Sequence, residues 1–415
     1  MELTIIELFS GIGAQTQALE NSKHIHTSIG TCEIDKDAML SYAIMHSGLT
    51  HEKIETYNFP SKNEMITYLS ARNIGWNFKK NAPYNWNRLS EEKIKEYYLA
   101  CIFSNNFGDI SKVNTLPYAD LWTYSFPCQD ISIAGKKRGI QKNKTRSGLL
   151  YEVERILENT KERPKYLLLE NVKNLLGKEF KPQFLEWVDR LDELGYDTYY
   201  AILNGRNYGI PQNRERVFAV SIRKDLHETY EFPNTIKLTK TVEDFLEETV
   251  DDKYYIHNEN VKVLLQELFD SGQLKPTRLV ADSTIKSPKI RTVSNCITAR
   301  YNAGIQRRSS IGTVVVEPKI EILMKIPQWH QRGSVYDPNG IIGCLTATDY
   351  KTPKMILDGF DVRKLTPKEC LRLMGFPDNK IDKVTSWSIS DAALYKQAGN
   401  SIIVNVLTAI FNKLP

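Results

Sequence analysis

Residues 3–20 read LTIIELFSGIGAQTQALE and decide which class of fold the chain adopts. Leu3 to Phe9 is a short apolar run, which predicts a buried strand. Ser10-Gly11-Ile12-Gly13 predicts a glycine turn that lets the backbone approach a ligand at the start of the helix predicted at 14–20. This turn is not the three-glycine dinucleotide fingerprint, because position 16 is Thr16. Taken alone, it is better explained as a plain tight turn.

The same alternation of strand and helix continues through the first half of the chain. Residues 147–158 have helical spacing. Strand candidates follow at residues 26–32 and 119–124, and further apolar runs predict strands at residues 166–169 and 217–222. Strands that alternate with helices predict an α/β fold with a doubly wound parallel sheet.

The chain has 415 residues, which is too long for one average core and indicates more than one domain. Its hydrophobic content of 41% and charged content of 25% exclude a disordered, collagen-like or coiled-coil protein. We predict a first domain at 1–223 with a mostly helical insertion at about 47–101. A second, smaller and irregular domain with its hinge follows at 224–384. The segment 385–415 is helical in pattern and is expected to return to the first domain.

Composition also limits where the protein acts. No run of about 18 apolar residues predicts a membrane span, and the N-terminus lacks a basic region followed by a long apolar stretch. Six scattered cysteines are too few for a disulfide framework. We therefore expect an intracellular, reducing compartment and no membrane partner.

The charge distribution indicates a polyanionic partner. The net charge of +5 is mild and by itself favours no partner. Residues 136–146 contain six basic residues and no acid, and residues 283–316 again contain six basic residues and no acid. Charge runs are often solvated faces, but two acid-free basic segments with glycines and polar side chains favour a polyanion.

Carboxylates stand at two predicted strand ends. Glu33 ends the strand at 26–32, where a carboxylate can accept hydrogen bonds from both ribose hydroxyls of a nucleoside. Asp109-Ile110 follows the insertion, and an Asp there can hold an adenine amino group while an apolar neighbour covers the ring. Each position also fits a solvent-exposed strand end. Their order along one sheet favours a cofactor of the nucleoside type.

Cys128 lies in Phe126-Pro127-Cys128-Gln129-Asp130, just after a predicted strand and before a basic, glycine-bearing loop. A lone cysteine is more often a small buried hydrophobe than a nucleophile. Because this one stands in a polar loop at the edge of the sheet where ligands bind, it is the best nucleophile candidate among the six.

Acid and arginine side chains follow the next strands. Glu170 ends an apolar strand, where it is a plausible proton donor or, alternatively, part of a helix N-cap. Arg214 and Arg216 alternate, so their guanidiniums share one face of a strand. A salt-bridged strand edge is the other interpretation of this arginine pair.

With these motifs in order, the chain resembles the DNA cytosine carbon-5 methyltransferases of bacteria and phages. Residues 145–150 and the long early insertion are similar to the mycoplasma-type, CG-specific members. The segments that carry the resemblance are Phe9 to Gly13, Glu33, Asp109-Ile110, Pro127-Cys128-Gln129, Glu170-Asn171-Val172, Gln212 to Arg216, Arg363 to Cys370, Leu373 to Pro377 and Gln397 to Ser401.

The resemblance implies a Rossmann-like, S-adenosylmethionine-dependent fold with a doubly wound mixed sheet and a smaller target-recognition domain. It implies that Cys128 adds to carbon-6 of a flipped-out cytosine, because cytosine carbon-5 is a poor nucleophile until a thiolate has added. Glu170 would contact ring nitrogen 3 and the exocyclic amine, and Arg216 would hold the carbonyl oxygen. Arg214 would lie near the thiol and favour the thiolate.

The resemblance also assigns the cofactor, S-adenosylmethionine, to residues at both ends of the chain. No metal-ligand spacing of Cys and His is present, so no metal is expected. The implied cofactor-binding residues are Phe9, Gly11, Ile12, Gly13, Glu33, Asp109, Ile110, Pro127, Leu149, Asn400 and Ser401.

The implied partner is double-stranded DNA with a short specific site. Residues 129–148 form a basic loop beside the nucleophile that suits base flipping, and loops of 224–361 are expected to enter the major groove. The DNA-binding candidates are Gln129, Ser132, Lys136, Lys137, Arg138, Arg146, Arg300, Tyr301, Arg307, Arg308, Thr346 and Thr348.

Three rival interpretations remain open. A tRNA cytosine-5 methyltransferase would use the same catalytic parts, but the long variable region favours DNA. A catalytically inactive DNA-binding module is disfavoured because the nucleophile, acid and arginines are all present. An amino-methylating enzyme is disfavoured because its Asp/Asn-Pro-Pro-aromatic tetrapeptide is missing. We expect a monomeric, cytoplasmic enzyme.

Overall fold

The computed structural model describes residues 2–77, 82–127, 146–255 and 361–415. It also describes the short segments 279–281, 322–325, 334–336, 341–345 and 355–358. Statements below about what is absent refer to these residues.

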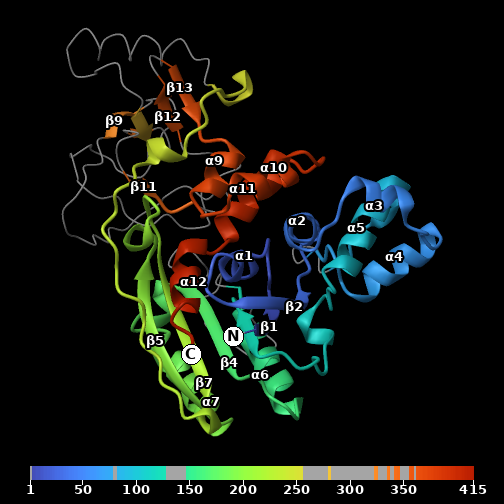
Figure 1. Cartoon of the computed structure of the whole chain (residues 1–415). Coiled ribbons are helices and arrows are strands. Elements are labelled where there is room, and N and C mark those ends of the chain that lie inside the picture. The colour runs from blue at the N-terminus through green and yellow to red at the C-terminus, as the bar shows by residue number, and fades with distance from the viewer. Residues whose placement is uncertain are drawn as a thin grey trace.

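A six-stranded mixed sheet forms the centre of the molecule (Figure 1). Its strand order is β2-β1-β3-β4-β7-β5. The first four strands of this order run parallel, whereas β7 is antiparallel to both of its neighbours. The strands are β1 (Glu2–Leu8), β2 (Ile25–Cys32), β3 (Leu121–Tyr124), β4 (Tyr166–Val172), β5 (Tyr196–Asn204) and β7 (Glu215–Arg223).

The sequence predictions for five of these strands are confirmed, and the α/β class with them. The edge strand β5 was not predicted. Its burial alternates irregularly, with Tyr200 and Ile202 exposed, so it lacks the continuous apolar run that marks a strand covered on both faces. Its pairing with β7 along nine residues holds it in the sheet.

Helices cover both faces of the sheet. Alternate side chains of β1 point to opposite faces, so each face carries apolar side chains that a helix layer buries. Leu3 and Ile5 pack with α1 (Ala14–Glu20), α2 (Lys36–His46) and α12 (Val404–Phe411) in one core cluster. On the other face, Ile6 and Leu8 pack with α6 (Leu150–Asn159) and α7 (Lys181–Glu193). This is the doubly wound arrangement that the alternation predicts.

The insertion after β2 is helical. It consists of α3 (His51–Thr56), α4 (Lys62–Ala71) and α5 (Glu91–Phe103). Side chains of Thr50, Ser61 and Ser90 accept hydrogen bonds from the first turns of these helices, which fixes where each one begins. Figure 1 shows this group beside the edge of the sheet at β2.

The C-terminal part returns to the first sheet (Figure 1). It contains α9 (Pro367–Arg372), α10 (Asp378–Thr385), α11 (Asp391–Asn400) and α12, which packs on α1. The helical pattern over 394–414 is therefore two helices, interrupted at Ser401, Ile402 and Ile403.

Short strands and turns complete the described chain. A five-stranded sheet has the order β13-β12-β8-β10-β9, from β8 (Leu279–Ala281), β9 (Ile322–Lys325), β10 (Ser334–Tyr336), β12 (Met355–Asp358) and β13 (Asp361–Lys364). β6 (Gln212–Asn213) pairs with β11 (Ile342–Gly343). The 3-10 helices are η1 (Trp86–Arg88), η2 (Ile110–Lys112), η3 (Arg146–Leu149), η4 (Lys173–Leu176), η5 (Gly205–Tyr208), η6 (Lys224–Leu226), η7 (Val242–Phe245) and η8 (Asp252–Tyr254). Within the described ranges, no helix has the length and apolarity needed to cross a membrane.

Candidate active site

The register of the sheet brings the predicted site residues into one row. Leu8 pairs with Cys32 on one side and Tyr124 on the other, and Tyr124 pairs with Leu169. The four strands are parallel, so the residues that follow this row lie along the same carboxyl edge. These residues are Phe9, Glu33, Ser125 and Glu170.

The glycine turn wraps over the end of β2. Phe9 has a positive φ of 61°, and the amides of Phe9 and Ser10 both donate to the carbonyl oxygen of Cys32. The amide of Gly11 donates to Oε2 of Glu33 at 2.9 Å. A Cβ on Gly11 would meet no atom within 4 Å, so the backbone here faces open space. The turn is therefore accessible to a ligand.

The other residues of the turn serve packing. The side chain of Ile12 is 2% exposed and lies in the core. Gly13 has a φ of 81°, and a Cβ there would come within 2.8 Å of His46 and Tyr42 of α2. The need for glycine at position 13 thus comes from close packing against α2, which the spacing alone did not indicate.

Glu33 is held at the centre of this edge. Its Oε1 accepts from the amide of Asp35 at 2.7 Å, and Asn106 binds the backbone amide and carbonyl of Glu33 through its own side chain. Burial raises the pKa of the Glu33 carboxyl to about 7, and the nearby Asp35 carboxylate adds to this rise. A ligand that donates hydrogen bonds to this carboxyl would favour its ionised form.

Asp109 and Ile110 lie where the insertion rejoins the sheet. Asp109 caps η2, with its Oδ1 accepting from the amide of Ser111 at 3.0 Å. Ile110 is 3% exposed and packs in the core beneath. Asp109 is only partly buried, so its carboxylate remains available at the surface of the edge.

The remaining predicted cofactor residues lie in three segments. Pro127 follows β3 and Leu149 ends η3, and both are partly exposed. Asn400 is the exposed last residue of α11, and Ser401, its C-cap, is 8% exposed.

These residues fit a nucleoside-type cofactor. Two partly buried carboxylates, Glu33 and Asp109, suit the hydroxyl and amino groups of an adenosyl group, which are hydrogen-bond donors. Ser10 Oγ in the glycine turn and Gln397 Nε2 in α11 are buried without a hydrogen-bond partner among the described residues. Such orphaned polar atoms beside an open backbone are consistent with a ligand-binding edge.

Glu170 and Arg216 form an ion pair on the neighbouring strands. Val172 of β4 pairs with Arg216 of β7, so Glu170 is the diagonal neighbour of Arg216 on the same face. Arg216 Nε lies 3.2 Å from Glu170 Oε1, and Glu170 is 8% exposed. Burial raises the pKa of Glu170, while Arg216 and Arg214 oppose that rise. Glu170 thus faces Arg216 from a buried position at the edge of the sheet.

Arg214 is buried between two distant segments. Its Nη1 donates to the carbonyl oxygen of Leu345 at 2.8 Å and to Sγ of Cys344 at 3.0 Å. Its Nη2 donates to the carbonyl oxygens of Gly399 at 3.1 Å and Ser401 at 2.6 Å. Arg216 Nη2 also reaches Cys344 Sγ, so both guanidiniums lie on one side, as the alternation predicted.

The predicted nucleophile, Cys128, lies outside the described residues, so its distance from Arg214 stays a prediction. Arg146 begins η3, but its side chain is not described. Also outside the described ranges are Gln129, Ser132, Lys136, Lys137, Arg138, Arg300, Tyr301, Arg307, Arg308, Thr346 and Thr348. In the described part of the chain, no cluster of three or more His, Cys, Asp or Glu side chains could hold a metal ion.

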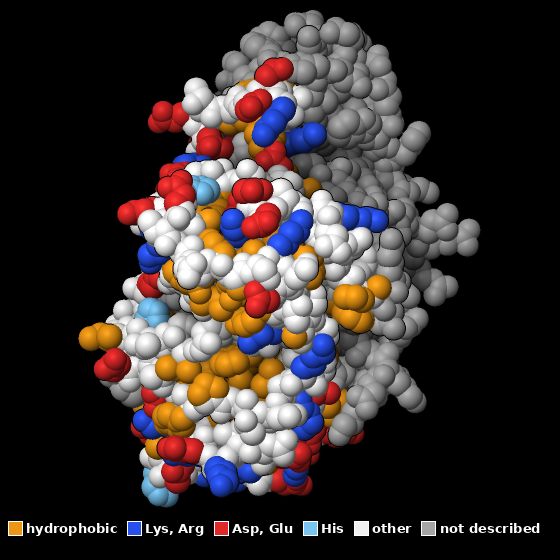
Figure 2. Space-filling model, turned by 90° about the vertical axis from the view of Figure 1, so that its right-hand side faces the viewer, with side chains coloured by type: hydrophobic (Ala, Val, Ile, Leu, Met, Phe, Trp, Pro, Cys, Tyr) orange, Lys and Arg blue, Asp and Glu red, His pale blue; other side chains and the backbone are white. Residues whose placement is uncertain are grey.

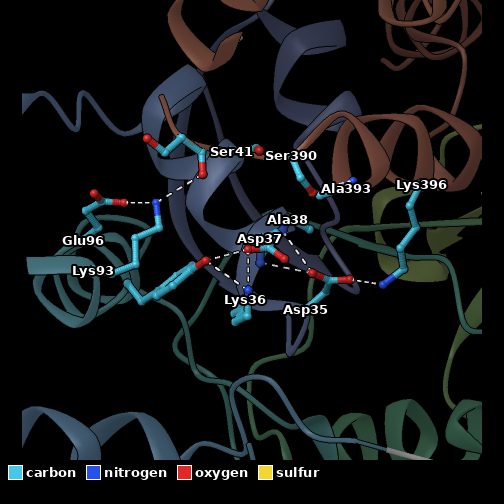
Figure 3. A network of polar contacts seen from close by, with 12 residues as sticks. Asp35, Lys36, Asp37, Ala38, Ser41, Lys93, Glu96, Ser390, Ala393 and Lys396 are labelled. Atoms are coloured by element: carbon cyan, nitrogen blue, oxygen red, sulfur yellow. Dashed lines mark hydrogen bonds and ion pairs between the residues drawn. The ribbon is translucent and has the colours of Figure 1, made fainter. Parts of the chain in front are cut away.

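The sequence did not predict a polar network that lies close to Glu33, at the carboxyl edge of the sheet. Figure 3 shows Asp35 binding Lys396 of α11 and capping α2 through the amides of Asp37 and Ala38. Asp35 lies two residues after Glu33 and directly precedes an apolar helix, which is a signal for an N-cap. Its partner Lys396 lies 361 residues away, a pairing that no local pattern indicates.

Comparisons with known proteins identify the family of the chain. Residues 62–415 match the sequence model of the family described as C-5 cytosine-specific DNA methylase. The type II methyltransferase M2.ScrFI of Lactococcus lactis subsp. cremoris is 35% identical over 415 residues, covering 99% of each chain. The orphan methyltransferase M.SssI of Spiroplasma monobiae is 32% identical, covering 100% of this chain and 97% of that protein.

Solved structures share the fold. The Entamoeba histolytica methyltransferase EhMeth covers 100% of this chain and 98% of its own, with a TM-score of 0.52 and 18% identity. The Dnmt2 methyltransferase of S. pombe covers 99% and 97%, with a TM-score of 0.50 and 16% identity. Together, these matches confirm the S-adenosylmethionine-dependent methyltransferase fold expected from the sequence. From the family match and the two relatives above 30% identity over the whole chain, it follows that this protein belongs to the C-5 cytosine-specific DNA methylase family and is a DNA cytosine-5 methyltransferase.

Proposed function

We propose that the enzyme methylates carbon-5 of a flipped-out cytosine within a short specific sequence of double-stranded DNA, through a covalent adduct of Cys128. The observation that carries this proposal is the buried ion pair of Glu170 and Arg216, 3.2 Å apart. The pair lies at the carboxyl edge of the sheet, where Glu33 also lies. Pro127 follows β3 at this edge and directly precedes the proposed nucleophile, Cys128, in the sequence.

In this mechanism, the Cys128 thiolate forms a bond to carbon-6 of cytosine, and the electron pair displaced from the ring double bond makes carbon-5 nucleophilic. Glu170 contacts ring nitrogen 3 and the exocyclic amine, and it stabilises the protonated ring as the thiolate adds. Arg216 holds the carbonyl oxygen of the base. After methylation, a base removes the carbon-5 proton, the bond to Cys128 breaks, and the thiolate leaves as aromaticity returns.

S-adenosylmethionine, the cofactor of this family, supplies the methyl group when bound. Glu33 accepts hydrogen bonds from the ribose hydroxyls, and Asp109 accepts one from the adenine amino group. Phe9 and Ile110 cover the apolar parts of the cofactor. Gly11 has no side chain and so leaves space beside the turn. Further contacts come from the backbone of Ile12 and Gly13, whose side-chain positions face the core, and from Pro127, Leu149, Asn400 and Ser401.

The target base must leave the duplex, because attack occurs above the ring plane where neighbouring bases stack. We assign this task to the basic segment 129–148, and sequence recognition to residues 224–361. The face in Figure 2 intermixes acidic, basic and apolar side chains and has no single basic field.

The first test is methylation mapping of a methylation-free bacterial host that expresses the enzyme, with Cys128→Ala alongside. We expect 5-methylcytosine at one short motif, with CG as the first candidate, and none with the variant. Methylation that persists in Cys128→Ala would remove the covalent adduct from the mechanism.

A second arm uses Cys128→Ser with purified duplex DNA, tRNA and S-adenosylhomocysteine. We expect loss of transfer by at least about 10³-fold, with binding of cofactor and duplex DNA within about twofold of wild type. Transfer by the wild type to tRNA alone would overturn the DNA assignment.

A further inference from the structure

The helical insertion reaches the carboxylate that we propose holds adenine. Asn73 follows α4, and its Nδ2 donates to Oδ2 of Asp109 at 2.7 Å. The other oxygen, Oδ1, accepts from the amide of Ser111 at 3.0 Å and from its hydroxyl at 2.8 Å. A carboxylate oxygen accepts about two hydrogen bonds, so one acceptor position on Oδ2 remains for a ligand.

A lysine determines which way the Asn73 amide points. Lys112 Nζ donates to Oδ1 of Asn73 at 2.8 Å and to the carbonyl oxygen of Ala71 at 3.2 Å. An ammonium group can only donate, so the amide oxygen must face Lys112 and the amide NH₂ must face Asp109. The three side chains therefore form a directed chain of hydrogen bonds.

Backbone hydrogen bonds hold this turn against the part of the protein that carries Glu33 and Asp109. The amide of Asp109 donates to the carbonyl oxygen of Arg72 at 2.9 Å, and that of Gly75 donates to the carbonyl oxygen of Ile34 at 2.6 Å. Gly108, with φ 82°, lies so close that a Cβ would come within 2.4 Å of the Arg72 oxygen. The insertion is thus fixed against the end of β2, which Glu33 follows, and against the start of η2, which Asp109 caps. Asp109 was predicted at a strand end, and the structure instead places it at the start of this 3-10 helix.

We propose that Asn73 is a positioning residue for adenine recognition: it orients the Asp109 carboxylate so that the open acceptor position of Oδ2 meets the exocyclic amino group. The inference rests on the adenine role proposed for Asp109. It gives the insertion a function, which is to make the enzyme select an adenosyl group over nucleosides that carry an acceptor at the same position.

The test compares S-adenosylhomocysteine with S-inosylhomocysteine, in which a carbonyl oxygen replaces the adenine amino group. Calorimetry measures the affinity of each for wild type and for Asn73→Gly. Asn73 has φ 55°, a conformation that glycine adopts freely, so the variant removes the side chain without straining the turn. Asn105→Gly is the matched control, since Asn105 has φ 42° and its amide binds the Ile29 carbonyl instead.

We expect wild type to favour the adenosyl ligand by about 100-fold, because an acceptor facing Asp109 is rejected. Asn73→Gly should bind S-adenosylhomocysteine about tenfold more weakly and S-inosylhomocysteine within about twofold of wild type, so discrimination falls. Asn105→Gly should leave both affinities unchanged. Equal losses for both ligands in Asn73→Gly would show a merely structural role and overturn the inference.

Asp109→Ala separates this inference from the proposed function. If Asp109→Ala discriminates as wild type does, the adenine assignment of Asp109 fails, and the role of Asn73 fails with it. If Asp109→Ala loses discrimination while Asn73→Gly retains it, only the inference about Asn73 fails. Loss of discrimination in both variants supports the two assignments together.

Discussion

At the end of β2, burial and a neighbouring carboxylate raise the pKa of Glu33 to about 7. The amides of Gly11 and Asp35 and the ammonium of Lys396 favour the ionised form, whereas the Asp35 carboxylate opposes it. The pKa of Lys396 is raised and that of Asp35 is lowered, so both stay charged near neutral pH. Glu33 is therefore the group in this cluster that titrates near neutrality.

We predict that affinity for S-adenosylhomocysteine rises by about tenfold between about pH 6 and about pH 8 and then levels off. The ribose hydroxyls donate to the ionised carboxylate, so binding lowers the pKa of Glu33 and releases a proton. Calorimetry in buffers of different ionisation enthalpy measures that proton. Glu33→Gln should bind more weakly and independently of pH; a flat profile in wild type would contradict the assignment.

Within single elements, polar groups fix where helices begin. Thr366 and Glu369 form a capping box at the start of α9. Glu369 also pairs with Arg363 of β13 through two hydrogen bonds, at 2.8 and 2.9 Å, and both side chains are fully buried. One carboxylate thus joins the last strand of the smaller sheet to the helices that return to the first sheet.

Glu369→Ala should lower the free energy of unfolding by about 3 to 5 kcal/mol, because it leaves the buried Arg363 charge unpaired. Chemical denaturation measures the change. Asp192→Ala is the control, since its pair with Lys224 is largely exposed and should contribute no more than about 1 kcal/mol. The double variant Arg363→Met with Glu369→Leu should recover most of the loss. Equal effects of Glu369→Ala and Asp192→Ala would refute the role of the buried pair.

At the scale of the whole molecule, Arg214 joins three parts of the chain. It precedes β7, and its guanidinium binds carbonyl oxygens of residues 345, 399 and 401. The last two flank Asn400, a proposed cofactor contact. Through one buried side chain, this geometry couples Leu345, in the region proposed for DNA recognition, to the segment that holds Asn400.

Arg214→Lys should loosen the segment 399–403, since one ammonium group cannot reach all of these acceptors. We expect hydrogen exchange of the amides in 399–403 to accelerate by at least about tenfold, the effect of a hydrogen bond lost in a buried site. Arg216→Lys is the comparison variant, because Arg216 contacts Glu170, the Glu215 carbonyl oxygen and Cys344 Sγ. It should lose activity and keep wild-type exchange at 399–403. Unchanged exchange in Arg214→Lys would exclude the coupling role.

Local sequence patterns were sufficient to predict most strands of the central sheet and to indicate the family. Apolar runs predicted β1, β4 and β7, because a strand covered on both faces must be continuously apolar. The predicted strands β2 and β3 fitted the alternation of strands and helices. Short motifs in order along the chain were enough to indicate the family, because the chemistry requires particular side chains at strand ends. The domain boundaries predicted from composition remain predictions.

The features that the sequence did not predict depend on contacts between residues that lie far apart in the chain. β5 is a strand because β7 pairs with it, and Gly13 is required because α2 packs against it. The partners of Asp109, Glu33 and Arg214 come from segments separated by tens to hundreds of residues. Propensity and periodicity act over a few residues, whereas a buried polar group binds whatever packing brings within about 3 Å of it.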